Sequence, residues 1–145
     1  MNRKAVIFGI QGHKLTNNER FLFKKTKPWG IILFSRNINN IFQLKNLIDD
    51  IKNLFNDKKY PILIDQEGGK VSRLNKIINL DFFSQNFFGQ LYLNDKKLFL
   101  NQYNIYINKV CDILKNIGVN INTVPILDVR RKKSHNVIGS RSFSE

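Results

Sequence analysis

The stretch that decides the fold is PILIDQEGGKVSR, residues 61–73. Its first four residues form a short apolar run that is typical of a strand buried on both faces. The chain becomes polar at Asp65 and continues through Glu67 into two glycines. Polar groups at the carboxyl ends of parallel strands face the crevice where ligands bind, so this pattern indicates a candidate site. An acidic turn after a strand is the structural alternative.

Strand and helix patterns alternate on both sides of this stretch. The strands are expected to start near Lys4, Gly30, Pro61 and Val119. This alternation favours an α/β fold with a parallel sheet and right-handed crossovers. A doubly wound sheet and a β/α barrel share the pattern. Residues 9–12 lack the glycine spacing that cradles a dinucleotide pyrophosphate, which weakens the doubly wound alternative.

Capping residues and apolar spacing also predict helices. These are one that Thr16 or Asn17 caps and Pro28 closes, one with an apolar face from Leu44 to Phe55, and one from Leu98 to Ile117 that Gly118 ends. Residues 70–94 show no sustained period. They are expected to form a long loop with short helical pieces, packed by aromatic side chains.

Composition and charge narrow the function classes. With 42% hydrophobic residues among 145, the chain is expected to be globular and to form a single domain, residues 1–145. The formal net charge of +13 is compatible with nucleic-acid binding. However, 17 of the 24 basic residues are Lys scattered along a chain rich in Asn and Ile, which is the skew that AT-rich codons produce. A nucleic-acid partner is therefore not expected.

The sequence predicts neither a membrane span nor a secretion signal. No run approaches the ~20 apolar residues of a transmembrane helix, and the N-terminal apolar run is too short for a signal-peptide core. The single cysteine, Cys111, excludes an internal disulfide and is expected to be a buried, inert thiol. A cytoplasmic location is the default expectation.

Four motifs follow one another along the chain: IILFSRN at 31–37, IDQEGGKVSR at 64–73, VPILDV at 124–129 and VIGSRSF at 137–143. Their order and spacing resemble glycoside hydrolase family 3, specifically the bacterial cytoplasmic β-N-acetylhexosaminidases of peptidoglycan recycling. The resemblance covers essentially the whole chain. It implies the N-terminal half of a TIM-type (β/α)8 barrel, about four βα units long.

The same resemblance implies a reaction. Terminal non-reducing β-N-acetylglucosamine would be hydrolysed from peptidoglycan fragments with retention of configuration, through a covalent glycosyl-enzyme. The substrate would be a muropeptide containing N-acetylglucosamine or a chitooligosaccharide-like molecule. No metal or organic cofactor is implied.

On this resemblance, three residues are expected to bind substrate: Asp65, Arg73 and Arg141. A carboxylate such as Asp65 accepts two sugar hydroxyl hydrogen bonds at once, and the planar fork of an arginine orients sugar oxygens. The structural alternative for either arginine is a salt bridge to a neighbouring carboxylate such as Glu67. Lys70 departs from the Arg common in the family and receives no sugar contact, and the family assigns Glu67 no acid/base role.

The resemblance places no catalytic residue in this chain. Retaining glycosidases need a nucleophilic carboxylate and a proton donor. The family's late-strand Asp nucleophile and its His/Asp proton-donor loop both fall beyond Glu145. His13 and His135 are expected to be exposed loop residues. Asp128 matches a structural position, so a catalytic pair of Asp65 and Asp128 is not expected.

Three functional hypotheses remain open at this point. A barrel of this type runs to about 250 residues, so the chain is expected to be roughly its first half and to be inactive alone. The leading hypothesis is the substrate-binding half of a β-N-acetylglucosaminidase. The alternatives are a non-catalytic half-barrel that binds an amino sugar or a partner subunit, and a basic nucleic-acid-binding domain. Open sheet edges would favour aggregation or pairing with another copy.

Overall fold

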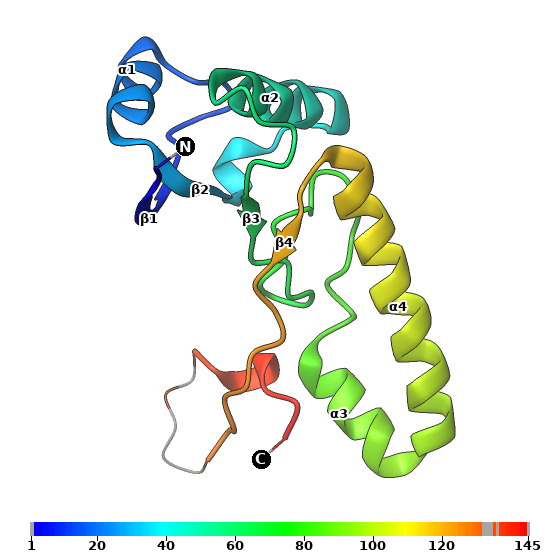
Figure 1. The fold of residues 1–145 in the computed structure, drawn as a ribbon. Coiled ribbons are helices and arrows are strands. Elements are labelled where there is room, and N and C mark those ends of the chain that lie inside the picture. Colours follow the sequence, from blue (N-terminus) through cyan, green and yellow to red (C-terminus); the bar gives the residue numbers. More distant parts are fainter. Residues whose placement is uncertain (1, 132–134, 136, 145) are drawn as a thin grey trace.

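The computed structural model describes residues 2–131, 135 and 137–144. Within these residues four strands form one sheet in chain order, and every neighbouring pair is parallel (Figure 1). The strands are β1 (Lys4–Gly9), β2 (Pro28–Leu33), β3 (Ile62–Ile64) and β4 (Ile121–Asn122). The parallel order confirms the α/β prediction and fits half of a barrel.

Helices connect the strands. They are α1 (Asn17–Thr26), α2 (Ile41–Leu54), α3 (Gln85–Asn94) and α4 (Lys96–Ile117), with 3₁₀ turns η1 (Ser35–Asn37) and η2 (Gly139–Arg141). Gly118 ends α4 with a φ of 92°, as the sequence predicts. Searched over the described part of the chain, no helix is long and apolar enough to cross a bilayer.

The core lies between one face of the sheet and the helices. Ile31, Leu33, Ile62 and Ile64 are completely buried there, in one cluster with apolar residues of α1, α2 and α4. Side chains alternate along a strand, so the intervening residues belong to the opposite face. Leu63 is on that opposite face. Asp65 lies two residues further along the chain, just after the end of β3, and therefore on the same face as Leu63. The carboxylate is therefore directed away from the helices.

Thr16 caps α1 as expected. Its hydroxyl accepts a hydrogen bond from the Glu19 backbone N–H, and the Glu19 carboxylate accepts one from the Thr16 backbone N–H at 2.8 Å. Desolvation acts to raise the pKa of Glu19. Hydrogen bonds from the backbones of Thr16 and Gln11 and from the Thr16 hydroxyl outweigh it, so the pKa is lowered. The reciprocal pair is a capping box.

Thr16→Ala is expected to lower the free energy of unfolding by about 1 kcal/mol, since it removes the cap acceptor. The contribution of Glu19 should be complete above its unfolded-state pKa and lost as the pH falls through the lowered folded-state value. Urea unfolding at neutral and acidic pH measures both effects. Thr26→Ala, at the last residue of the same helix, is the control. Equal stability of Thr16→Ala and the parent chain would contradict the capping assignment.

Three predicted boundaries were wrong. The first helix ends at Thr26 with Lys27 as a left-handed cap, so Pro28 opens β2 rather than closing the helix. The predicted strand from Val119 to Pro125 was too long. Only the two residues of β4 pair, because the neighbouring strand β3 has only three residues. The segment 70–94, expected as a long loop with short helical pieces, ends in one ten-residue helix, α3.

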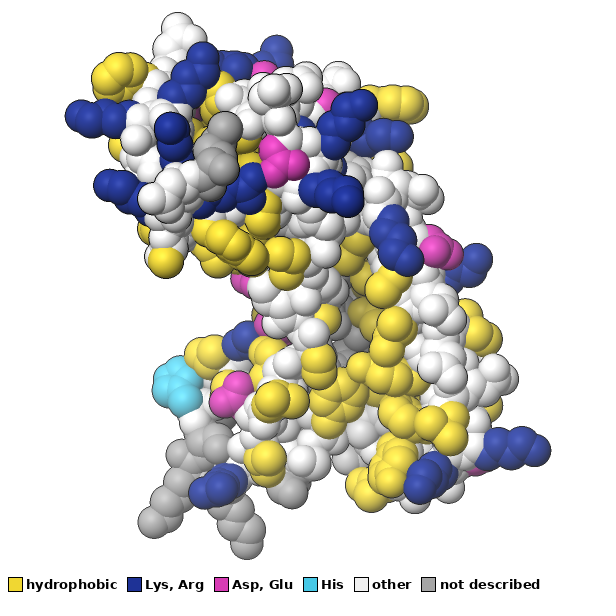
Figure 2. Space-filling view, in the orientation of Figure 1, with side chains coloured by type: hydrophobic (Ala, Val, Ile, Leu, Met, Phe, Trp, Pro, Cys, Tyr) yellow, Lys and Arg dark blue, Asp and Glu magenta, His cyan; other side chains and the backbone are white. Residues whose placement is uncertain are grey.

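Apolar and basic side chains occupy different parts of the face drawn in Figure 2. Lys and Arg lie mainly over the α1 and α2 part, while apolar side chains gather over the middle and around α3 and the start of α4. Exposed apolar residues of these two helices are Tyr92, Leu93, Leu98, Leu100, Ile105 and Ile107.

Candidate functional site

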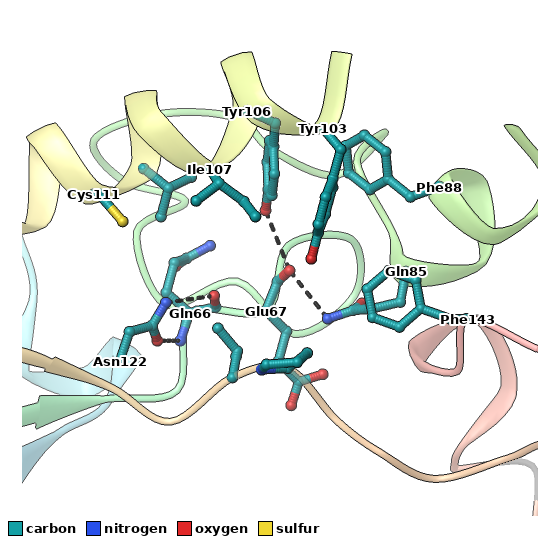
Figure 3. Close-up of a pocket in the computed structure, with 13 residues that line it drawn as sticks. Gln66, Glu67, Gln85, Phe88, Tyr103, Tyr106, Ile107, Cys111, Asn122 and Phe143 are labelled. Atoms are coloured by element: carbon teal, nitrogen blue, oxygen red, sulfur yellow. Dashed lines mark hydrogen bonds between the residues drawn. The ribbon is translucent and has the colours of Figure 1, made fainter. Parts of the chain in front are cut away.

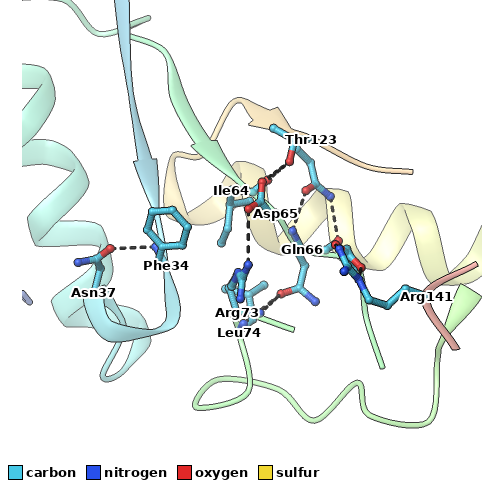
Figure 4. A network of polar contacts seen from close by, with 11 residues as sticks. Phe34, Asn37, Ile64, Asp65, Gln66, Arg73, Leu74, Thr123 and Arg141 are labelled. Atoms are coloured by element: carbon cyan, nitrogen blue, oxygen red, sulfur yellow. Dashed lines mark hydrogen bonds and ion pairs between the residues drawn. The ribbon is translucent and has the colours of Figure 1, made fainter. Parts of the chain in front are cut away.

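The candidate site lies at the carboxyl ends of the strands. Asp65 directly follows β3, Phe34 follows β2, and Thr123 follows β4. Because the strands are parallel, these ends meet at the same edge of the sheet. Figure 4 shows the contacts of Asp65 with Thr123 and Arg73, whereas the Phe34 backbone is hydrogen-bonded to Asn37.

Each of the two oxygens of the Asp65 carboxylate contacts one neighbouring side chain. Oδ1 accepts a hydrogen bond from the Thr123 hydroxyl, and Oδ2 lies 3.5 Å from Nη2 of Arg73. The side chains of Asp65 and Arg73 are 29% and 26% exposed. The carboxylate is thus oriented by the protein while part of it remains accessible to a ligand.

A buried glutamine shapes the loop that returns Arg73 to Asp65. Gln66 is 1% exposed, and its Oε1 accepts hydrogen bonds from the backbone N–H groups of Arg73 at 2.8 Å and Leu74 at 3.0 Å. Asn122 of β4 accepts a hydrogen bond from the Gln66 backbone N–H at 3.0 Å. These bonds satisfy buried polar groups and fix the loop against β4.

Gly68 provides a tight turn in this loop. Its φ is 91°, and a Cβ at this position would lie 2.4 Å from both the Phe83 carbonyl oxygen and the Tyr106 hydroxyl. Only glycine fits both the backbone conformation and the space. Burial raises the pKa of Tyr106 to about 12. Its protonated hydroxyl donates to the Glu67 carbonyl at 3.2 Å.

Arg141 is fixed by a buried carboxylate. Nε and Nη2 of Arg141 donate to the two carboxylate oxygens of Glu67 at 2.9 and 2.8 Å. The Glu67 side chain is 5% exposed and that of Arg141 is 25% exposed. The hydrogen bonds to Glu67 raise the pKa of Arg141, with weaker contributions from the charges of Asp128 and Asp65. The bidentate pair orients the guanidinium and leaves its Nη1 edge outside the contact.

The guanidinium groups of Arg36 and Arg73 both lie over the ring of Phe34. The centre of the Arg36 guanidinium lies 4.6 Å from the ring centroid, and that of Arg73 lies 5.7 Å from it. Arg36 also donates to the Ile10 carbonyl at 3.0 Å, which connects the end of β1 to the site. Cations stacked on an aromatic face are attracted by its quadrupole, so Phe34 supports the placement of Arg73.

The sequence profile of the glycosyl hydrolase family 3 N-terminal domain matches residues 4–145. This chain belongs to glycosyl hydrolase family 3. It is 33% identical over 124 residues to "Beta-hexosaminidase A" of Pseudoalteromonas piscicida, covering 80% of this chain and 20% of that protein. It is 28% identical over 140 residues to the beta-hexosaminidase of Xanthomonas campestris pv. campestris strain B100, covering 97% of this chain and 41% of that protein.

Solved structures show the same family relationship. NagZ from Neisseria gonorrhoeae, in complex with N-trifluoroacetyl-D-glucosamine, superposes with a TM-score of 0.85 at 31% identity. The alignment covers 98% of this chain and 42% of that one. This glycosyl hydrolase family 3 chain therefore spans less than half the length of these hexosaminidase relatives.

Within this family member, the structure joins the sequence-predicted residues in two pairs. Asp65 pairs with Arg73, and Arg141 pairs with Glu67, as the salt-bridge alternative for an arginine anticipated. Asp128 has an exposed side chain, and its carbonyl accepts a hydrogen bond from the Ser142 hydroxyl at 2.7 Å. Whether the three predicted residues touch a sugar stays a prediction.

Sequence reasoning missed the residues that support the site. Gln66, Asn122 and Thr123 were not singled out, although each is a polar residue at or just after the end of β3 or β4. Polar residues at such positions indicate a hydrogen-bond network, because polar groups that become buried need hydrogen-bond partners. Cys111, expected to be buried, is half-buried instead. His13 and His135 are exposed, as predicted.

Proposed function

We propose that residues 1–145 form one partial barrel domain of a β-N-acetylhexosaminidase, and that Asp65, Arg73 and Arg141 bind the sugar. The proposed reaction is hydrolysis of terminal non-reducing β-N-acetylglucosamine from peptidoglycan fragments. The observation that carries it is the Asp65 carboxylate, fixed by Thr123 and Arg73 at the carboxyl end of β3 and still partly exposed. The named activity of the relatives and the amino-sugar complex of one of them support the same reaction.

The contacts of Asp65 favour binding over covalent attack. One oxygen accepts from Thr123 and the other faces a cation, so the charge is stabilised, while lone pairs remain for sugar hydroxyls. The Nη1 edge of Arg141 is available for a sugar oxygen. In the proposed retaining mechanism, the nucleophile and the proton donor come from outside residues 1–145. The proposed location is the cytoplasm, with muropeptides as substrates.

Reconstitution with a relative tests this proposal. The chain would replace the matching N-terminal 41% of the Xanthomonas campestris beta-hexosaminidase. The chimera is expected to hydrolyse 4-nitrophenyl N-acetyl-β-D-glucosaminide, whereas residues 1–145 alone should not. Circular dichroism verifies folding, and the matching β-glucoside, which lacks the acetamide group, is the control substrate. A folded chimera without hydrolysis would contradict the enzymatic proposal.

Binding by the chain itself separates the remaining alternatives. Titration of residues 1–145 with N-acetylglucosamine, followed by nuclear magnetic resonance, should shift the backbone signals of Asp65 and Arg73. Sugar binding without activity in the folded chimera would favour the non-catalytic half-barrel. Duplex DNA at low ionic strength is the comparison ligand, and tight, salt-dependent binding to it with no sugar binding would favour the nucleic-acid alternative.

A further inference from the structure

The turn after β2 is closed by a buried asparagine. Asn37 is completely buried, and its Nδ2 donates to the carbonyls of Ile10 and Gly12, each at 3.0 Å. Its Oδ1 accepts a hydrogen bond from the Phe34 backbone N–H at 2.8 Å (Figure 4). The Asn37 backbone N–H in turn donates to the Phe34 carbonyl at 2.8 Å. Asn37 therefore fixes the backbone of Phe34 to the chain that follows β1.

The ring of Phe34 packs against the end of β1. Gly9 is the last residue of that strand, and a Cβ there would lie 3.2 Å from both the ring Cε2 and Nη2 of Arg36. Arg36 lies over the same ring and donates to the Ile10 carbonyl at 3.0 Å. The missing Cβ of Gly9 thus gives the ring and an anchored guanidinium their places beside β1.

The backbone at Arg73 is fixed independently of Phe34. Oε1 of the buried Gln66 accepts a hydrogen bond from the Arg73 backbone N–H at 2.8 Å. The Gln66 backbone forms two hydrogen bonds with the Asn122 side chain, at 3.0 and 3.3 Å (Figure 3). These contacts place the main chain, but the long side chain of an arginine keeps its rotamer freedom unless its guanidinium is held as well.

Two contacts hold that guanidinium. Nη2 of Arg73 lies 3.5 Å from Oδ2 of Asp65, which is longer than the usual distance of a charge-assisted hydrogen bond. The centre of the guanidinium lies 5.7 Å from the centroid of the Phe34 ring. Among the described residues, Nε of Arg73 is buried and has no hydrogen-bond acceptor. The aromatic face of Phe34 is therefore the second restraint on the direction of this side chain.

We infer that Phe34 is a positioning residue of the proposed sugar site. Its ring, fixed to the end of β1 through Asn37 and Gly9, keeps the Arg73 guanidinium directed at Asp65. That this direction matters for the sugar rests on the proposed function, whereas the contact between the ring and Arg73 does not. A residue that only fills space would have no specific effect on Arg73, so the two roles give different experimental results.

The nuclear magnetic resonance signal of the Arg73 Nε–Hε group in residues 1–145 tests the positioning without any substrate. Arg73→Lys, which lacks this group, assigns the signal. Phe34→Leu is expected to speed exchange of the Nε proton with water about fivefold, the effect of losing one cation–π contact. Phe34→Tyr keeps the ring and should keep the slow exchange.

A matched control and a second variant complete this test. Phe21→Leu removes a ring that is 70% exposed on α1 and should leave the Arg73 signal unchanged. Phe34→Met retains apolar volume without a ring and replaces Phe34→Leu if that variant does not fold. Exchange at the parent rate in a folded variant without the ring would overturn the positioning role.

Kinetics of the chimera test the consequence for the sugar. Phe34→Leu is expected to lower kcat/KM for 4-nitrophenyl N-acetyl-β-D-glucosaminide about fivefold, and Phe34→Tyr should restore it. In an Arg73→Ala background, Phe34→Leu should have no further effect, because it acts only through Arg73. An equal loss of activity in both backgrounds would indicate a general structural effect and overturn the inference.

The two experiments separate this positioning role from the hydrolysis itself. A folded parent chimera without activity would contradict the proposed function, while proton exchange at Arg73 would still decide the role of Phe34. An active chimera in which Phe34→Leu retains both full kcat/KM and slow exchange would overturn the role of Phe34 and leave the proposed hydrolysis intact.

Discussion

Asp65→Ala is expected to lower kcat/KM of the reconstituted hexosaminidase by at least about 100-fold, with little change in stability. A hydrogen bond to a charged group contributes about 1.5–3 kcal/mol, and Asp65 is proposed to accept two from the sugar. The half-exposed side chain follows the end of β3 and fills no part of the core, so its removal leaves the packing intact. Steady-state hydrolysis and urea unfolding measure the two effects separately.

Two further variants sharpen this test. Asp65→Asn retains the shape but places a neutral amide opposite Arg73, so most of the activity loss should remain. Asp112→Asn removes an equivalent charge at an exposed position of α4 and should leave activity unchanged. For residues 1–145 alone, the affinity for N-acetylglucosamine should fall at least tenfold in Asp65→Ala. Unchanged turnover and affinity would show that Asp65 does not bind the sugar.

The second large effect concerns stability. Arg141→Ala is expected to reduce the free energy of unfolding by about 2–3 kcal/mol, because it leaves the carboxylate of Glu67, whose side chain is 5% exposed, without its counter-charge. The value is below that of a fully buried pair because Arg141 retains some contact with solvent. Urea unfolding of residues 1–145 measures the change.

An exposed ion pair of the same chain is the control. Arg20 and Asp50 also form a salt bridge, but both side chains are 36% exposed. Asp50→Ala should therefore cost less than 1 kcal/mol, roughly the value of a surface pair. A double-mutant cycle of Glu67→Ala and Arg141→Ala isolates the coupling between the two charges. A coupling energy near zero would contradict the role assigned to Glu67.

Tertiary contacts explain why residues 85–94 were predicted as short helical pieces and not as the single helix α3. Its interior glycine, Gly89, lowers the helix propensity of the segment. In the fold, a Cβ at this position would lie 1.8 Å from the Phe143 carbonyl oxygen, so the glycine allows the C-terminal segment to approach the helix. The helix signal that was present is Ser84, whose hydroxyl accepts a hydrogen bond from the Phe87 N–H.

The pairing of the arginines was also outside the reach of local patterns. Glu67 and Arg141 are 74 residues apart, and the sequence offered the salt bridge only as one alternative. The contact depends on η2 lying next to the loop after β3, which the packing of the C-terminal segment on α3 brings about.

By itself, the sequence determined the alternation of strands and helices, the caps at Thr16 and Gly118, and the position of Asp65 at the end of a strand. These features depend on hydrophobic period and local backbone preference, which neighbouring residues specify. The tertiary structure decided which charges pair and how short β4 is. Those outcomes depend on distances between segments far apart in the chain, which no local pattern encodes.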